Sequence, residues 1–159
     1  MADVGSEDHP LRVAIIGSGP AGFYSVSNFL KHSDLCVEMD MYEKLPTPFG
    51  LVRAGVAPDH QKYKTVTKAY DKSASASSFR FFGNVEFGKD ITLQDLRTHY
   101  HQVIFATGAQ ADRALDIPGE DAIGSHSAFI LWCWYRGMVL VSTVNTVCRY
   151  GRNGSIRST

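Results

Sequence analysis

The chain has 159 residues, 44% of them hydrophobic, and its 16 acidic and 16 basic residues cancel to zero formal charge. A chain of this length suits one domain with a core that hides roughly two-thirds of the unfolded surface, and it is too short for two nucleotide-binding domains. The composition is ordinary for a globular protein and gives no indication that nucleic acid is a partner.

The cysteines and the N-terminus indicate a reducing compartment. Cys36, Cys133 and Cys148 are odd in number and form no CxxC pair, so the sequence predicts neither a disulfide framework nor a zinc site. Residues 1–10 are polar and end at Pro10, and we expect them to be a mobile leader. Because they are acidic and lack an apolar core, they resemble neither a secretory signal nor a basic transit peptide, which favours the cytoplasm.

The first apolar run leads into a glycine-rich turn. Residues 11–17 predict a strand, and residues 20–32 predict a helix with apolar side chains at helical spacing. Between them, Gly17 permits a sharp turn, Gly19 lets the backbone approach a pyrophosphate, and Gly22 lets the helix pack closely on the strand. Phosphate oxygens would then lie at the positive end of the helix. This pattern is the first indication of a dinucleotide site.

A second strand ends in an acidic residue at a suitable distance. Residues 37–42 alternate apolar and polar side chains, and Glu43 follows 21 positions after Gly22. A doubly wound nucleotide fold places a carboxylate there to accept hydrogen bonds from ribose hydroxyls. Alone, Glu43 would be interpreted as a surface residue that ends a strand. The whole order of strand, glycine turn, helix, strand and acid favours a dinucleotide site.

The segment 44–60 is rich in proline and glycine and also contains several apolar residues. Its three prolines and two glycines lead us to expect neither a regular helix nor a strand. Phe49, Leu51, Val52 and Val56 nevertheless need a surface to cover. Two interpretations remain: the segment covers a flat aromatic cofactor above the sheet, or it is a buried irregular loop that packs on its own domain.

The elements that follow complete a parallel sheet. Residues 60–75 predict an amphipathic helix, residues 79–88 predict one strand or two short strands, and Thr92 starts an N-capped helix through about residue 100. The run 102–109 is apolar and ends in small residues, so we expect an interior strand whose end lets a ligand approach. The sequence therefore predicts the α/β class, with an incomplete Rossmann-like domain whose central parallel sheet is flanked by helices.

Five segments carry a more specific signal: IIGSGPAGFY (15–24), YEKLPTPFGLVRAGVAPDH (42–60), FFGNVEFGKDIT (81–92), YHQVIFATGA (100–109) and ALDIPGED (114–121). In order and spacing they closely resemble the N-terminal part of NADPH:adrenodoxin reductase-type ferredoxin–NADP reductases. The resemblance covers about residues 11–127 and is most specific in PFGLVRAGVAPDH. The DHQK at 59–62 is most similar to bacterial members of that family.

The resemblance implies that the cofactor at the first glycine turn is FAD. It implies that Ala21 and its glycine neighbours lie on the pyrophosphate, that Glu43 lies on the adenosine ribose and that Val85 lies near the adenine. It also implies that Leu51 lies against the cofactor and that the turn at 106–108 lies against the dinucleotide.

The same resemblance implies that Arg53 and His60 lie near the flavin, although His60 could instead be a histidine at a helix N-terminus that is satisfied by local backbone. No catalytic or metal-binding side chain is predicted. The candidate cofactor-binding residues are Gly17, Gly19, Pro20, Ala21, Gly22, Glu43, Lys44, Gly50, Leu51, Arg53, His60, Val85, Ala106, Thr107 and Gly108.

The resemblance is lost beyond Ser127. Family members continue into a second glycine-rich strand and helix that bind NADPH, and neither this motif nor a later glycine motif beside the flavin occurs here. Residues 122–159 contain four arginines and no acid. Three interpretations of the tail compete: a truncated or frame-shifted end without selected function, a membrane anchor over 129–148 that Arg136 interrupts, or a strand at 138–144 that completes the sheet. The expected division is a leader (1–10), an FAD-binding domain (11–127) and an atypical tail (128–159), with the NADPH-binding domain missing.

The resemblance implies a flavin-dependent oxidoreductase that moves electrons between NADPH and a ferredoxin-type iron–sulfur protein through FAD. The alternative is a non-catalytic FAD-binding fragment that cannot use NADPH alone, because its NADPH site is not seen. We expect neither a nucleic-acid partner nor a membrane partner.

Overall fold

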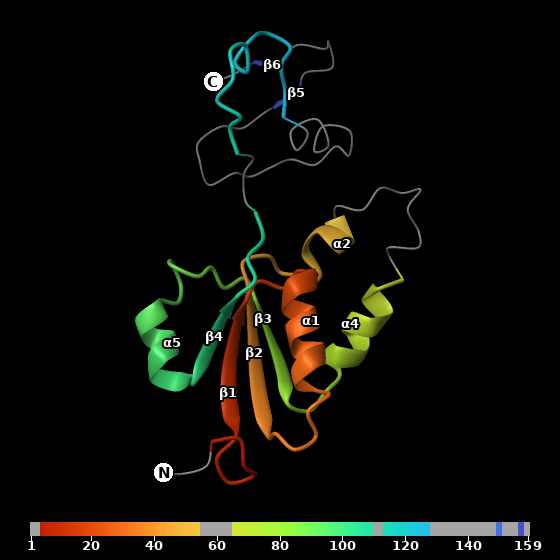
Figure 1. Ribbon diagram of the computed structural model, residues 1–159, viewed down its shortest axis with the longest axis vertical. Coiled ribbons are helices and arrows are strands. Elements are labelled where there is room, and N and C mark those ends of the chain that lie inside the picture. Colours follow the sequence, from red (N-terminus) through yellow and green to blue (C-terminus); the bar gives the residue numbers. More distant parts are fainter. Residues whose placement is uncertain (1–3, 55–64, 110–112, 128–148, 151–155, 158–159) are drawn as a thin grey trace. The chain divides into compact units, whose positions relative to one another are not determined.

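The computed structural model describes residues 4–54, 65–109, 113–127, 149–150 and 156–157 (Figure 1). The chain forms two compact units, Met1–Gly108 and Ala109–Thr159. In the second unit, β5 (Arg149–Tyr150) pairs antiparallel with β6 (Ile156–Arg157). Within the described ranges, no helix has the length and apolar content needed to cross a membrane. The elements of the first unit are β1 (Leu11–Ile16), α1 (Pro20–Phe29), β2 (Val37–Glu43), α2 (Gly50–Ala54), α4 (Thr67–Ala74), β3 (Phe79–Gly83), α5 (Leu93–His99) and β4 (Gln102–Phe105).

The first unit is built on a parallel sheet with the strand order β3-β2-β1-β4. Ile15 on β1 pairs with Met41 on β2 and with Ile104 on β4. Helices α1 and α4 lie on one face of the sheet and α5 lies on the other (Figure 1). The predicted α/β fold, a central parallel sheet flanked by helices, is confirmed.

The position of β4 differs from the prediction. Residues 102–109 were expected to form an interior strand, but β4 lies at an edge of the described sheet and Phe105 is 53% exposed. Val103 packs against the core on the α5 side, whereas Ile104 packs against the core on the α1 side. Because both faces of this edge strand are partly covered, its sequence is as apolar as that of an interior strand.

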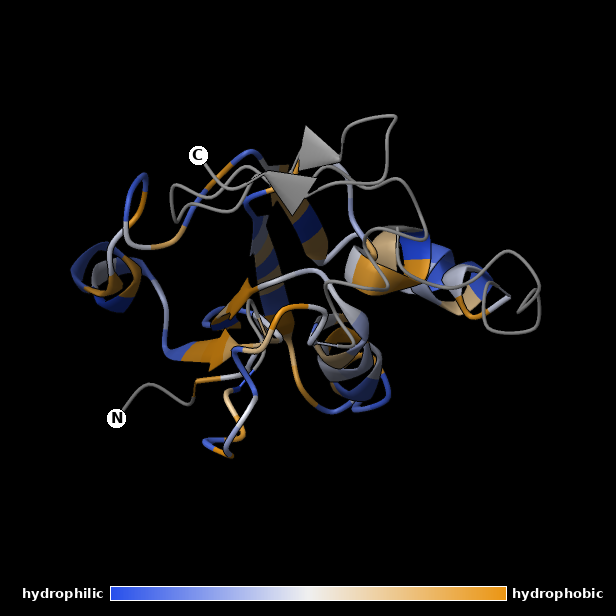
Figure 2. Ribbon diagram, turned by 90° about the horizontal axis from the view of Figure 1, so that it is seen from above, coloured by the Kyte–Doolittle hydropathy of each residue, from blue (hydrophilic) through white to orange (hydrophobic). Residues whose placement is uncertain are grey.

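The larger hydrophobic core lies between the sheet and the helices α1 and α4. The rings of Phe23 on α1 and Tyr70 on α4 stack with their centroids 5.0 Å apart. Hydrophobic residues also gather along the strands (Figure 2). Burial of apolar surface stabilises the folded state by roughly 25 cal/mol per Å². The buried residues of α1 therefore hold this helix against the sheet. The completely buried strand and α1 residues of this core are Val13, Ile15, Met39, Met41 and Val26.

Helix α5 begins where the sequence predicts. The Thr92 hydroxyl accepts a hydrogen bond from the Asp95 amide, and the Asp95 carboxylate accepts one from the Thr92 amide at 2.8 Å. This reciprocal capping box satisfies two of the backbone donors at the start of the helix. The Thr92 hydroxyl also donates to the Asp95 carboxylate at 2.6 Å, and this hydrogen bond, followed by the one from the Thr92 amide, lowers the pKa of Asp95.

Three other boundaries differ from the predictions. The segment 44–60 does contain a helix, α2, because the stretch from Phe49 to Ala57 carries no proline. Helix α1 ends at Phe29 rather than at residue 32, and β3 ends at Gly83. The predicted helix 60–75 is represented by α4, while residues 60–64 lie outside the described residues.

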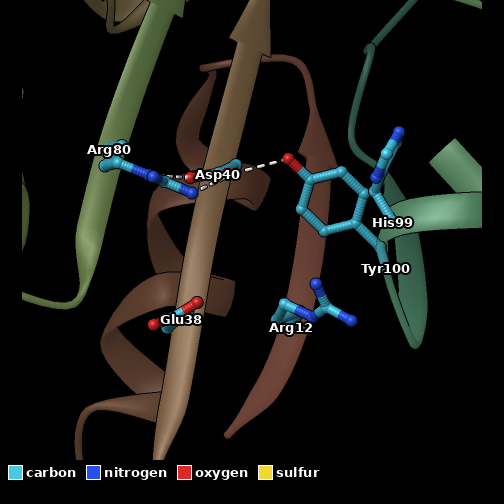
Figure 3. A pocket seen from close by; sticks show the side chains of 6 residues that line it. All are labelled: Arg12, Glu38, Asp40, Arg80, His99 and Tyr100. Carbon is cyan, nitrogen blue, oxygen red and sulfur yellow. Dashed lines mark hydrogen bonds and ion pairs between the residues drawn. The ribbon is translucent and has the colours of Figure 1, made fainter. Parts of the chain in front are cut away.

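A polar cluster ties β2, β3 and the end of α5 together (Figure 3). Asp40 on β2 is only 3% exposed, and its carboxylate accepts hydrogen bonds from Arg80 Nε at 2.7 Å and Nη2 at 2.8 Å. The Tyr100 hydroxyl donates to the same carboxylate. The pKa of Tyr100 is raised, mainly by burial and in second place by this hydrogen bond. The sequence analysis did not identify this cluster. The hollow beside it is also lined by Arg12, Glu38 and His99.

The cluster predicts a specific loss of stability in Asp40→Asn. The variant removes the charge that pairs with Arg80 and weakens the acceptor for Tyr100. Arg80 is well exposed, so we expect unfolding free energy to fall by roughly 2–3 kcal/mol rather than by the full cost of breaking a wholly buried pair. Urea denaturation measures the change. The matched control is Glu38→Gln, an exposed acid on the same strand, which should change stability by less than about 0.5 kcal/mol.

Candidate functional site

The candidate site lies where β1, β2 and β4 reach their carboxyl ends (Figure 1). The turn after β1 is fixed from both sides by backbone hydrogen bonds. The Gly17 amide donates to the Tyr42 carbonyl at 2.8 Å, and the Ala106 amide donates to the Ile16 carbonyl at 2.8 Å. The three strand ends therefore meet at the edge where doubly wound folds bind their ligands.

Two of the turn glycines are required by the packing of the chain itself. Gly17 has a φ of +103°, and a Cβ atom added there would lie 2.4 Å from the Ala106 carbonyl oxygen. A Cβ atom at Gly22 would lie 2.4 Å from the Gly17 carbonyl oxygen. These close approaches explain both glycines without any ligand.

Gly19 is different because no contact with the residues that the structure describes requires a glycine there. A Cβ atom added at Gly19 would meet no heavy atom within 4 Å, and its φ of −77° is available to any residue. The side of Gly19 therefore faces open space. A glycine in this position leaves room for a group from outside the chain to approach the backbone.

The N-terminus of α1 lies at this open space. Gly19 is the N-cap residue, Pro20 occupies the first turn, and no side chain caps the helix. Helix geometry leaves the amides of Gly19, Ala21 and Gly22 without a carbonyl partner inside the helix. Together with the positive end of the helix dipole, these amides suit an anion such as a pyrophosphate.

The carboxylate of Glu43, at the end of β2, binds the same turn. Glu43 Oε2 accepts hydrogen bonds from the Ser18 amide at 2.9 Å and from the Ser18 hydroxyl at 2.7 Å. Glu43 Oε1 accepts a hydrogen bond from the Leu45 amide at 3.2 Å. Ser18 is completely buried and Glu43 is partly exposed. The acid is thus anchored by the protein on one side and reaches solvent on the other.

A strained segment brings α2 to the glycine turn. The Phe49 amide donates to the Ser18 carbonyl at 3.0 Å, and Phe49 has a φ of +86°, which is rare for a bulky residue. Its ring is buried against Phe23, with the centroids 5.1 Å apart. Such strain persists only where the surroundings enforce it. As a result Gly50 approaches so closely that a Cβ atom there would lie 3.2 Å from Gly19 Cα.

Other predicted residues on α2 face solvent. Leu51 is 58% exposed, an unusual state for leucine beside a core. The Arg53 Nε donates to the Pro48 carbonyl at 2.9 Å, and its guanidinium lies 5.1 Å from the centre of the Phe49 ring. The side chains of Leu51 and Arg53 are therefore exposed on the helix that follows the contact between Gly50 and the glycine turn.

The remaining predicted residues lie at neighbouring strand ends. The Val85 amide donates to the Glu43 carbonyl at 3.0 Å, which places Val85 beside the acid. Lys44 is exposed next to Glu43. Ala106 continues β4, and Thr107 and Gly108 follow it as exposed residues. His60 lies outside the described residues.

The sequence analysis missed two residues of this site. The sequence analysis assigns no role to Ser18 and interprets Phe49 only as an apolar residue that needs cover. The contact of Ser18 with Glu43 could have been suspected from the sequence, because a hydroxyl residue lies inside the glycine turn and an acid follows the second strand. The positive φ of Phe49 has no counterpart in the local sequence except the following Gly50.

Known proteins are similar to this chain over part of their length. No protein-family model matches the chain. The NADPH-ferredoxin reductase FprA of Mycobacterium leprae is 51% identical over 131 residues, which cover 80% of this chain and 29% of that protein. The human mitochondrial NADPH:adrenodoxin oxidoreductase is 46% identical over 127 residues, which cover 80% of this chain and 26% of that protein.

A solved structure agrees with these relatives. The structure of Mycobacterium tuberculosis FprA in complex with NADPH matches with a TM-score of 0.72 and 48% identity, covering 80% of this chain and 29% of that one. The chain therefore spans less than a third of the length of the relatives it matches. It is a homologue of one part of the NADPH-ferredoxin and NADPH:adrenodoxin reductases.

Proposed function

We propose that this chain binds FAD at the carboxyl edge of its sheet and forms the FAD-binding portion of a ferredoxin–NADP reductase. The observation that carries the proposal is the open space at Gly19, beside an uncapped helix N-terminus. Nothing within the described protein explains a glycine there, whereas a bound pyrophosphate does. The proposed domain extends over residues 11–127, between a leader at 1–10 and a tail at 128–159.

The described residues fit the adenosine diphosphate half of FAD. The amides of Gly19, Ala21 and Gly22 would bind the pyrophosphate, with Pro20 setting the start of the helix. Glu43, which keeps an exposed side, would accept hydrogen bonds from the ribose hydroxyls. By the family resemblance, the residues proposed to flank the rest of the cofactor are Lys44, Gly50, Leu51, Arg53, His60, Val85, Ala106, Thr107 and Gly108.

In the proposed activity, FAD held by these residues would supply the redox chemistry between NADPH and an iron–sulfur protein. The chain's own residues bind and orient the cofactor and exclude water from its buried side. The relatives' names mention NADPH, ferredoxin and adrenodoxin, which supports a ferredoxin-type partner. The alternative remains a non-catalytic FAD-binding module, and the partial coverage of the relatives favours testing it directly.

We propose the cytoplasm as the compartment, because Cys36 is a free thiol and the three cysteines of the sequence form no CxxC pair, as is common in a reducing compartment. The human relative is named as mitochondrial, so the two compartments are distinguished by locating a tagged chain in its own cell.

The variant Gly19→Ala tests whether Gly19 is needed for ligand binding rather than for the packing of the chain. Since no heavy atom lies within 4 Å of the added methyl group, the free chain should keep its melting temperature to within a few degrees. FAD affinity should fall by about tenfold or more, because the methyl group occupies space that the pyrophosphate needs. Thermal denaturation and fluorescence titration with FAD measure the two effects.

Gly22→Ala is the matched comparison for this experiment. Its methyl group would collide with the Gly17 carbonyl, so the free chain itself should lose stability. If Gly19→Ala bound FAD as tightly as the unaltered chain, the proposed position of the pyrophosphate would be wrong.

A reduction experiment with NADPH distinguishes a chain that acts as a reductase by itself from one that only binds FAD. With FAD bound, we expect anaerobic NADPH to leave the yellow flavin absorbance unchanged over minutes, because the glycine-rich NADPH motif of the family does not occur in this sequence. Dithionite should bleach the same sample, which shows that the flavin is competent. Prompt bleaching by NADPH would instead establish a hydride-donor site in this chain and contradict the binding-module alternative.

A further inference from the structure

Ser18 has no polar group left for a ligand. Its amide and hydroxyl both donate to Glu43 Oε2, at 2.9 and 2.7 Å, and its carbonyl accepts from the Phe49 amide at 3.0 Å. Its side chain is completely buried. Ser18 can therefore influence a bound molecule only through the groups it holds.

The group it holds is the proposed ribose acceptor. An ionised carboxylate offers about four acceptor positions on its two oxygens. In Glu43, two are taken by Ser18 and one by the Leu45 amide at 3.2 Å. These three donors fix the rotamer of Glu43 before any ligand arrives, and they leave acceptor capacity on the partly exposed side chain.

We propose that the Ser18 hydroxyl is a positioning residue that pre-orients the Glu43 carboxylate for the adenosine ribose hydroxyls of FAD. This inference rests on the proposed function. Its physical basis is preorganisation: a carboxylate that is already held in one orientation loses less side-chain entropy when it binds the ribose.

The hydroxyl is separable from the structural role of the turn. Without it, the Ser18 amide still donates to Glu43, and the Ser18 carbonyl still accepts from Phe49. Gly17 and Gly22 keep their backbone contacts as well. Ser18→Ala is therefore expected to fold, with its main effect on the freedom of the Glu43 side chain.

A double-mutant cycle tests the inference. FAD dissociation constants are measured by fluorescence titration for the unaltered chain, Ser18→Ala, Glu43→Gln and the double variant. We expect Ser18→Ala to weaken FAD binding by roughly 3- to 10-fold, and to change it by less than about twofold when Glu43→Gln is already present. Ser25→Ala is the control, since it removes a hydroxyl from α1 that, among the described residues, bonds to the Ala21 carbonyl within the same helix.

Each outcome decides a different statement. FAD binding that is undiminished in Ser18→Ala, or that falls by the same factor in both backgrounds, would overturn the positioning role while leaving the proposed function intact. Failure of the unaltered chain to bind FAD would overturn the proposed function and the inference with it. Melting temperatures of the free variants report folding. If Ser18→Ala is unfolded, Ser18→Cys replaces the hydroxyl with a somewhat larger group that is a weak donor, and it enters the cycle in its place.

Discussion

The hydrogen bond from the buried Ser18 amide to the carboxylate of Glu43, which the Ser18 hydroxyl supplements, is the interaction on which the carboxyl edge of the sheet depends. It joins the turn after β1 to the end of β2, and the Ser18 carbonyl extends the connection to the entrance of α2. Because Ser18 is completely buried, water cannot replace a lost partner without opening the structure. The edge is therefore assembled before any ligand binds.

This assembly gives the three turn glycines different tasks. Gly17 and Gly22 allow backbone to approach backbone, so the protein needs them in order to fold. A side chain at Gly19 would meet none of the described residues, and no side chain caps the N-terminus of α1. The hydrophobic core between α1, α4 and the sheet then holds that N-terminus in place, because Phe23 and Val26 are anchored in it. Packing energy on one face of the sheet thus positions the uncapped N-terminus of α1 at its edge.

Much of this arrangement could be predicted from the sequence because its signals are local. The strand, glycine turn and helix around Gly17, and the N-cap at Thr92, depend on residues only a few positions apart. The Ser18–Glu43 pair and the Asp40–Arg80–Tyr100 cluster could not be predicted this way, since they join residues that only the fold brings together. The positive φ of Phe49 is likewise imposed by tertiary packing. For β4, an apolar run cannot distinguish an interior strand from an edge strand with both faces partly covered.

The measurement that tests the central claim most directly is a titration of the isotope-labelled chain with FAD, followed by amide chemical shifts in NMR spectra. The account predicts that the largest shifts occur at Gly19, Ala21 and Gly22 and at the strand end around Glu43. Shifts that instead concentrate around Asp40 in the middle of β2 and Arg80 near the start of β3, or no shifts with saturating FAD, would contradict it.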